Sequence, residues 1–409
     1  MTALLTRRAF GAGLCGCGAT LLAACTATSD HLSRPAAPGQ KIQSEVPAGY
    51  RPALASDEGE IWASIGKVED QVKQSRFLVR DAALNEYVRG QGDSMAGDNR
   101  SDVRVYLIRT PVFNATMYPT GMMQVWSGFL LRSRNEAQMA AVLGHELGHF
   151  VRRHSLQKWR DSRNKQDFAV FASLGLAVAG LGAVGELARL AAVASQFGFN
   201  REQEREADTY GMQLLVELGY DPYQAAMVWQ QQMEDEQAAE DGPRSRSLLF
   251  ASHPSGAERQ QNMSDQAKAT GLQPGQGAVN ADRYRRVMAG ARPWMLRDEV
   301  RLRTPGPSLA LFNRLLSDDP QDAEVLFARG EVRRLRARNN DFDLALADYA
   351  AAAATGRAPA TTHRSTGFLL QRRQDFTGAA AAFGRYLDTE PQAEDRAVIA
   401  AMIKNGGRP

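Results

Sequence analysis

Apolar residues recur at helical spacing along most of this chain. Between residues 58 and 89, four of them predict one or two amphipathic helices: Ile61, Ile65, Val68 and Val72. The same periodicity predicts further helices over about 135–154, 200–216, 222–239 and a segment ending near 270. Two short apolar runs, 103–108 and 122–126, predict strands, and the residues between them at 114–121 are typical of turns. The pattern therefore predicts a mainly α (α+β) protein with a small β-sheet.

The first 24 residues have the pattern of an export signal. Arg7 and Arg8 precede an apolar run that is too short and too rich in glycine for a comfortable membrane-spanning helix. The run ends in Leu-Ala-Ala-Cys25, which resembles a bacterial lipobox, and the segment around Arg7 resembles a twin-arginine signal. We expect lipid on Cys25, with Thr26 favouring the outer membrane by resemblance to enteric lipoproteins. A Sec signal, cleavage at a nearby small residue and an uncleaved anchor remain alternatives.

Composition narrows the class of protein only slightly. A formal net charge of +3 provides no electrostatic case for nucleic-acid binding. The three cysteines are Cys15, Cys17 and Cys25, so a chain that begins at Cys25 would have no disulfide. Residues 25–57 read as a proline-rich tether. The apolar segment 168–194 contains an uncharged run of marginal length with four glycines, which favours a helical hairpin packed on the domain over a membrane span. Whether this hairpin touches the membrane surface is left open.

The C-terminal part contains an internal repeat. Asp341-Phe342 recurs as Asp375-Phe376, and Tyr349 recurs as Phe383, each 34 residues later. This period resembles the tetratricopeptide repeat, so we expect helical repeats over 306–403 after a linker at 271–305. Gly330 lies about three positions early, which indicates an insertion at 338–340. Stacked helical pairs would form a concave docking surface for peptides. The alternative is a generic alanine-rich helical bundle.

The candidate chemistry begins with Gly144-His145-Glu146-Leu147-Gly148-His149. Residues four apart share a helix face, so the imidazoles of His145 and His149 converge as ligands for a zinc ion. Glu146 lies beside the metal, where it can act as the base that takes a proton from water. When this motif is considered on its own, the alternative is a surface helix with two ordinary histidines.

A catalytic zinc needs a third protein ligand. The metzincin pattern is excluded because its ligand position holds Ser155. His154 is out of register with His149, so we expect it to face solvent. Glu204 and Asp208 lie four apart on the 200–216 helix, so one can bind zinc while the other accepts the N–H of a ligand histidine. The competing carboxylates are Glu202 and Glu206, which we expect on a solvated charged face.

Three motifs in order carry a family resemblance: Asn135-Glu136 with the histidine helix, Glu204-x-Glu-Ala-Asp208-x-x-Gly211, and Ser252-His253-Pro254 with Arg259. Together they resemble the HtpX/OMA/CAAX-prenyl-protease superfamily of gluzincins, and with the repeats they are most similar to BepA-type (YfgC-type) periplasmic proteases. The resemblance implies a metalloprotease domain over 58–270 that holds one zinc per chain. It implies that Glu204 binds the metal and that Asp208 stands behind His145.

The resemblance also bears on regulation and substrate binding. It implies that His253 can occupy the open zinc position and keep the enzyme latent, although a histidine that only makes local loop contacts is the alternative. It further implies that the strand at 122–126 pairs with an extended substrate.

The expected function is therefore a zinc endopeptidase of the periplasm, lipid-anchored to the outer membrane. Its substrates would be misfolded or misassembled outer-membrane or exported proteins, and its repeats would contact the outer-membrane assembly machinery. Two alternatives stay open. In one the protein is mainly a chaperone or assembly factor with a latent metal site. In the other it is a membrane-spanning HtpX-like protease, a hypothesis that rests on the apolar segment 168–194.

Overall fold

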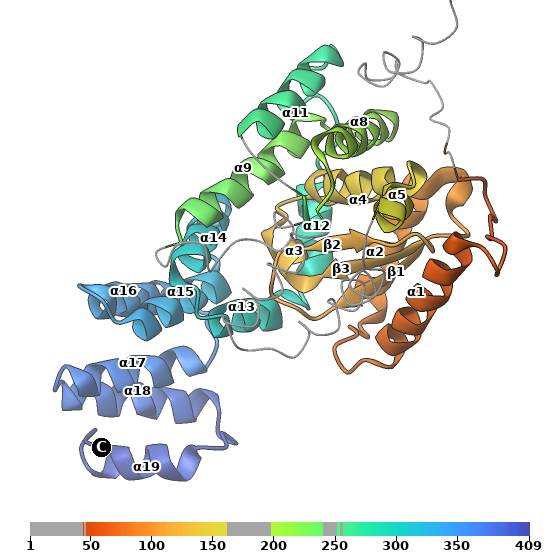
Figure 1. The fold of residues 1–409 in the computed structure, drawn as a ribbon. Coiled ribbons are helices and arrows are strands. Elements are labelled where there is room, and N and C mark those ends of the chain that lie inside the picture. The colour runs from red at the N-terminus through yellow and green to blue at the C-terminus, as the bar shows by residue number, and fades with distance from the viewer. Residues whose placement is uncertain (1–43, 45, 162–197, 240–251, 254–256) are drawn as a thin grey trace, which may run out of the picture.

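The computed structural model describes residues 44, 46–161, 198–239, 252–253 and 257–409 (Figure 1). The predicted signal, the lipidation site at Cys25, most of the tether and the apolar segment 168–194 lie outside these residues. Among the described helices, none combines the length and the apolar character needed to cross a bilayer.

A three-stranded sheet lies at the centre of the N-terminal half. Its strands are β1 (Arg104–Ile108), β2 (Ala115–Met117) and β3 (Met122–Trp126), in the order β1-β3-β2. Strand β3 pairs in parallel with β1 and antiparallel with β2, and all five of its residues are buried. The expectation that 122–126 is the substrate-binding edge is therefore wrong, because both of its edges are used. The edge strands are β1 and β2, and β2 lies within residues read from the sequence as a turn.

Helices surround this sheet, with α4 over one side of it and α8 beyond α4 (Figure 1). They are α1 (Asp57–Gln74), α2 (Ala82–Ala96), the 3-10 turn η1 (Gly97–Asn99), α3 (Ser127–Arg132), α4 (Glu136–Val151), α5 (His154–Asp161), α8 (Arg201–Glu217), α9 (Tyr223–Gln237) and α11 (Ala257–Ala269). Helix α4 begins where Asn135 caps the backbone N–H of Gln138 at 2.9 Å. Every residue of α4 is buried, so it is the core helix of the domain.

Residues 271–305, expected to be a linker, contain two helices instead. These are α12 (Ala281–Met288) and α13 (Arg292–Arg301), and the side chains of Tyr284, Met288 and Leu296 belong to the main hydrophobic core. A buried ion pair between Arg132 of α3 and Glu299 of α13, at 2.8 Å, fastens the segment to the sheet side of the domain. Only the start of the segment has the open glycine-rich character that the sequence indicated.

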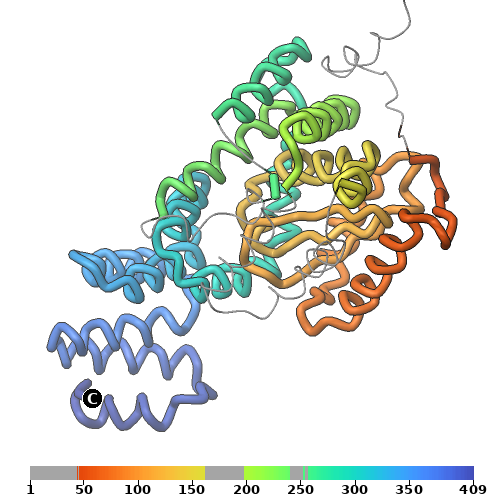
Figure 2. Tube along the Cα trace, in the orientation of Figure 1, coloured from red at the N-terminus to blue at the C-terminus, as the bar shows by residue number. Residues whose placement is uncertain are grey.

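The C-terminal part is entirely helical within 305–404. Its helices are α14 (Pro305–Asp318), α15 (Ala323–Arg336), α16 (Asp341–Ala354), α17 (Thr361–Arg372), α18 (Phe376–Thr389) and α19 (Arg396–Lys404). In Figure 2 the tube of α9 runs between α11 and α14, which pack against it, and the last helices of the chain lie below α14. Leu311 and Phe312 of α14 share the main core, whereas Phe383 and Ile399 form a separate small cluster.

Two hairpins of this region, α15–α16 and α17–α18, repeat one packing arrangement. A Cβ at Gly330 would overlap the ring of Tyr349, and a Cβ at Gly367 would overlap the ring of Phe383. In each hairpin a glycine on the first helix thus opens a notch for an aromatic ring on the second. The first hairpin has the longer turn, where Ala337 adopts a left-handed backbone with φ 53°. This arrangement accounts for the early position of Gly330 in the repeat.

Candidate metal centre

The metal centre begins with an unusually close crossing of α4 and α8. A Cβ at Gly148 would lie 2.7 Å from the Cα of Ala207, and a Cβ at Gly211 would lie 2.9 Å from the backbone nitrogen of His145. The two helices therefore meet backbone to backbone, which larger residues would prevent. This contact brings the histidines of α4 against the carboxylates of α8.

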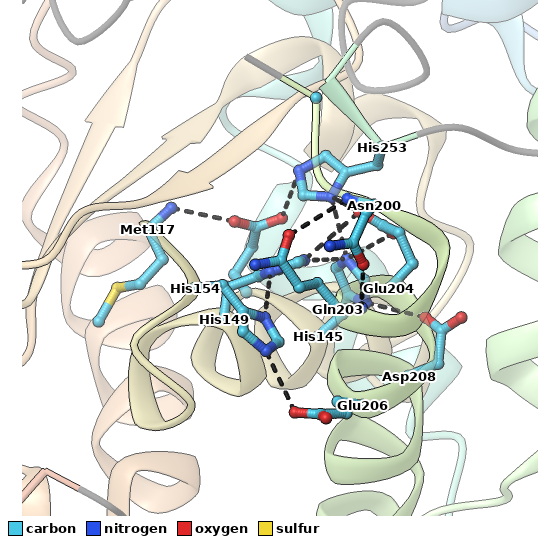
Figure 3. A network of polar contacts seen from close by, with 12 residues as sticks. Met117, His145, His149, His154, Asn200, Gln203, Glu204, Glu206, Asp208 and His253 are labelled. Atoms are coloured by element: carbon cyan, nitrogen blue, oxygen red, sulfur yellow. Dashed lines mark hydrogen bonds and ion pairs between the residues drawn. The ribbon is translucent and has the colours of Figure 1, made fainter. Parts of the chain in front are cut away.

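Four potential ligand atoms converge at the crossing (Figure 3). The Nε2 atoms of His145 and His149 are 3.1 Å apart, and His253 Nδ1 lies 3.2 Å from His145 Nε2. Glu204 Oε1 lies 2.9 Å from His253 Nδ1 and 3.6 Å from His149 Nε2. All four side chains are buried. Spacing indicated His145 and His149, and the family resemblance implied Glu204 and His253. The fold brings these residues from three separate segments together.

The donor set fits a metal ion. Ligands at 2.0–2.1 Å in tetrahedral geometry stand about 3.3 Å apart, close to the separations between the ligand atoms of this cluster. The two Nε2 atoms of His145 and His149 face each other, and both cannot carry a proton pointing at the same place. A cation among these lone pairs and the Glu204 carboxylate resolves the repulsion. His145, His149 and Glu204 could hold it, with His253 in the fourth position.

Asp208 lies behind His145, in the place that the family resemblance implies for it. Its Oδ1 lies 2.8 Å from His145 Nδ1, on the side of the ring away from the cluster. Arg259 of α11 lies 2.6 Å from the same carboxylate and 2.7 Å from Glu204 Oε2, and its guanidinium stacks 3.9 Å above the ring of Trp229. Burial raises the pKa of both carboxyls, but Arg259 and the neighbouring histidines together outweigh it, so the pKa values of Glu204 and Asp208 are lowered. The motif contained Arg259, but nothing in its spacing indicated this role.

Glu146 lies beside the four ligand atoms without joining them. Its Oε2 accepts the backbone N–H of Met117 from β2 at 3.0 Å, and its Oε1 lies 3.5 Å from His253 Nε2. Within the described residues, Oε1 has no hydrogen-bond partner. Burial raises the pKa of the Glu146 carboxyl above its ordinary value, although the neighbouring histidines oppose the change. A carboxylate with a raised pKa is suited to accept and return a proton.

The expectation for His154 is wrong. It is buried rather than solvated, with its Nδ1 2.9 Å from His149 Nδ1 and its Nε2 3.2 Å from Glu206 Oε2. The register argument failed because the helix does not continue: α4 ends at Val151, and Arg153 takes a left-handed backbone with φ 56° before α5 begins at His154. Glu206 therefore faces a histidine and not bulk solvent alone.

The remaining candidates lie outside the ligand cluster or at its edge. Glu202 is exposed and pairs with Arg205 at 3.4 Å, as a solvated charged face predicts. Phe199, which the sequence did not single out, stacks on the ring of His149 with centroids 3.8 Å apart. Its backbone N–H donates to the carbonyl oxygen of Ser252 at 2.9 Å, next to His253. The start of α8 and the His253 loop are thus joined directly over the site.

A histidine pair on one helix, a carboxylate on a crossing helix and an adjacent glutamate define the metallopeptidase class of site. Residues 80–267 match the model of Peptidase family M48, and the chain carries a domain of that family. Over 172 residues the chain is 34% identical to mitochondrial metalloendopeptidase OMA1 of Schizosaccharomyces pombe, covering 40% of this chain and 47% of that protein.

Two relatives come from Escherichia coli. The chain is 27% identical to its beta-barrel assembly-enhancing protease over 161 residues, which covers 37% of this chain and 33% of the relative. It is 27% identical to metalloprotease LoiP over 169 residues, which covers 41% and 64%. The chain thus matches less than two thirds of the length of each of these relatives.

Proposed function

We propose that this protein is a zinc-dependent endopeptidase of the cell envelope that cleaves misfolded or misassembled outer-membrane or exported proteins. The observation that carries the proposal is the convergence of His145, His149 and Glu204, with Glu146 within reach of the same point. A structural zinc site has no need of a free buried carboxylate beside its ligands. The M48 domain provides independent support for a metalloprotease.

In this proposal each residue has one role. His145, His149 and Glu204 hold zinc, which when bound supplies a Lewis acid for the peptide carbonyl and makes water more acidic. Glu146 takes the proton from the attacking water and delivers it to the leaving amine. Asp208 and Arg259 fix the orientation of His145 and Glu204.

An extended substrate would pair with the edge strand β2. Hydrogen bonds from Trp126 N–H to Asn114 O and from Tyr118 N–H to Met122 O connect β2 to β3. Because hydrogen-bonding directions alternate along a strand, the intervening residues Ala115 and Met117 direct their backbone groups to the other edge. Met117 N–H meets Glu146 there, so a peptide added at this edge would lie beside the catalytic base.

His253 is the proposed latch. Its Nδ1 takes the fourth ligand position, and its Nε2 points to the Glu146 oxygen that would otherwise meet water. A side chain in this place opposes both substrate binding and proton transfer. We therefore propose that the enzyme rests in a latent state from which the Ser252–His253 loop must withdraw.

The cellular setting is proposed from the sequence and the relatives. One relative is named a beta-barrel assembly-enhancing protease, which favours outer-membrane proteins as substrates. Lipid on Cys25 would place the enzyme at the outer membrane, and tetratricopeptide-like repeats over 306–403 would dock substrates or the assembly machinery. The occupied fourth position favours one alternative, in which the protein acts mainly as a chaperone and its protease is rarely active.

Metal analysis and a casein cleavage assay on the purified protein test the proposal. We expect one zinc per chain, cleavage that a chelator abolishes and added zinc restores, and faster cleavage by a His253→Ala variant. A protein without stoichiometric zinc would contradict the metal centre. A His253→Ala variant that is no faster than wild type would contradict the latch alone.

A further inference from the structure

The two zinc-ligand histidines proposed above have different partners behind them. His145 has a carboxylate at its Nδ1, from Asp208 at 2.8 Å. His149 has a second imidazole instead, from His154 at 2.9 Å. Because neither the M48 match nor the ligand spacing gives His154 a role, this contact requires its own explanation.

The positions of the hydrogens follow from the geometry. A histidine nitrogen that binds a metal carries no proton, so neutral His149 must hold its proton on Nδ1. That nitrogen faces His154 Nδ1, which must therefore accept, leaving the His154 proton on Nε2. His154 Nε2 lies 3.2 Å from Glu206 Oε2, an acceptor. One set of protons satisfies every contact, and the chain of donors ends on a carboxylate (Figure 3).

The backbone is shaped to deliver His154 to this place. On a continued α-helix, residue 154 would point about 140° away from residue 149. Instead, α4 ends at Val151 and α5 begins at His154. Between them Arg153 has a left-handed backbone, which is unfavourable for a residue other than glycine. The side chain of Arg153 is held by an ion pair with Glu58 and by stacking on Tyr50. Such strain persists where the surrounding structure enforces it, commonly at functional sites.

We propose that His154, supported by Glu206, is a positioning residue that fixes the tautomer and ring orientation of His149 for metal binding. It does for His149 what Asp208 does for His145. Phe199 completes the arrangement by stacking on the face of the His149 ring. This inference rests on the proposed zinc centre, and it concerns the affinity of that centre rather than the chemistry at the peptide bond.

Zinc affinity of the full-length protein tests this role through competition with a chromogenic chelator. His154→Leu removes the acceptor while keeping bulk, and we expect 10- to 100-fold weaker zinc binding. His154→Asn places a carbonyl oxygen near the former Nδ1, so we expect it to recover most of the affinity. Glu206→Leu should weaken binding several-fold, because His154 loses the acceptor that fixes its own tautomer.

Glu202→Leu is the matched control, since Glu202 is an exposed carboxylate on the same helix. We expect it to bind zinc like wild type. The Glu206 side chain is partly exposed, so we expect Glu206→Leu to fold even if His154→Leu does not. Wild-type zinc affinity in both Glu206→Leu and His154→Leu would overturn the role. Where His154→Leu does not fold, wild-type affinity in Glu206→Leu would overturn it. Equal losses in His154→Asn and His154→Leu would also overturn it, as packing alone would then explain them. A wild-type protein that binds no zinc would instead contradict the proposed function.

Discussion

The metal centre and the helical repeats use glycine at helix contacts for different purposes. At the crossing of α4 and α8, Gly148 and Gly211 let two backbones touch, so long polar side chains from both helices reach one point. In the repeats, Gly330 and Gly367 leave notches that aromatic rings fill. The first contact positions chemistry and the second only packs an interface. Disturbing the first should therefore cost function, and disturbing the second should cost stability without touching the chemistry.

The largest expected effect comes from a change inside the metal centre that leaves both helix contacts intact. Glu146→Gln keeps the size of the side chain and the acceptor for Met117 N–H but removes the base. We expect cleavage to fall by at least about 10³-fold, within the range of general-base losses, with zinc content unchanged. Peptide hydrolysis and metal analysis on the same preparation check this. Appreciable turnover by the variant would contradict the role of Glu146.

The second effect is on the backbone contact. In Gly148→Ala the added methyl group meets the Cα of Ala207 at 2.7 Å, which must push α4 and α8 apart. We expect a loss of about 1–3 kcal/mol in unfolding free energy together with weaker zinc binding. The control is Gly90→Ala on α2, where a Cβ meets nothing and helix propensity should stabilise by about 0.5–1 kcal/mol. A destabilised Gly148→Ala variant that binds zinc normally would break the proposed link between this contact and the site.

The smallest effect on chemistry comes from the repeats. Gly367→Ala places a methyl group in the notch filled by Phe383, so we expect about 1–3 kcal/mol of destabilisation in α17–α19. Gly384→Ala on α18 is the control, because a Cβ there meets nothing. Zinc binding and cleavage of a short peptide should be unchanged in both variants, as measured by chelator competition and a fluorogenic substrate. Loss of zinc in Gly367→Ala alone would show that the two regions are coupled.

The features predicted correctly from the sequence are those that depend on the spacing of residues within one helix or strand. His145 and His149 share a face because one helix carries both, and Glu204 and Asp208 do so for the same reason. Strand 122–126 was found from its apolar run, but its central position depends on β2. That strand lies in the segment 114–121, where Pro119 and Gly121 had indicated only a turn. Alternation along one strand carries no information about how many neighbours it has.

The misses share a cause in non-local structure. His154 was misplaced because a left-handed backbone at Arg153 ends the helix, and the side chain that holds this turn pairs with Glu58, far away in sequence. The segment 271–305 was taken for a linker because its glycines stand out, whereas Tyr284 and Leu296 find their partners in the main hydrophobic core. Tertiary contacts of this kind leave no periodic signal.

X-ray absorption at the zinc edge of the purified protein tests the central claim most directly. The account predicts one zinc per chain with nitrogen and oxygen ligands at about 2.0–2.1 Å, three imidazoles in wild type and two in His253→Ala. A site without histidine ligands, or one with sulfur ligands, would contradict it.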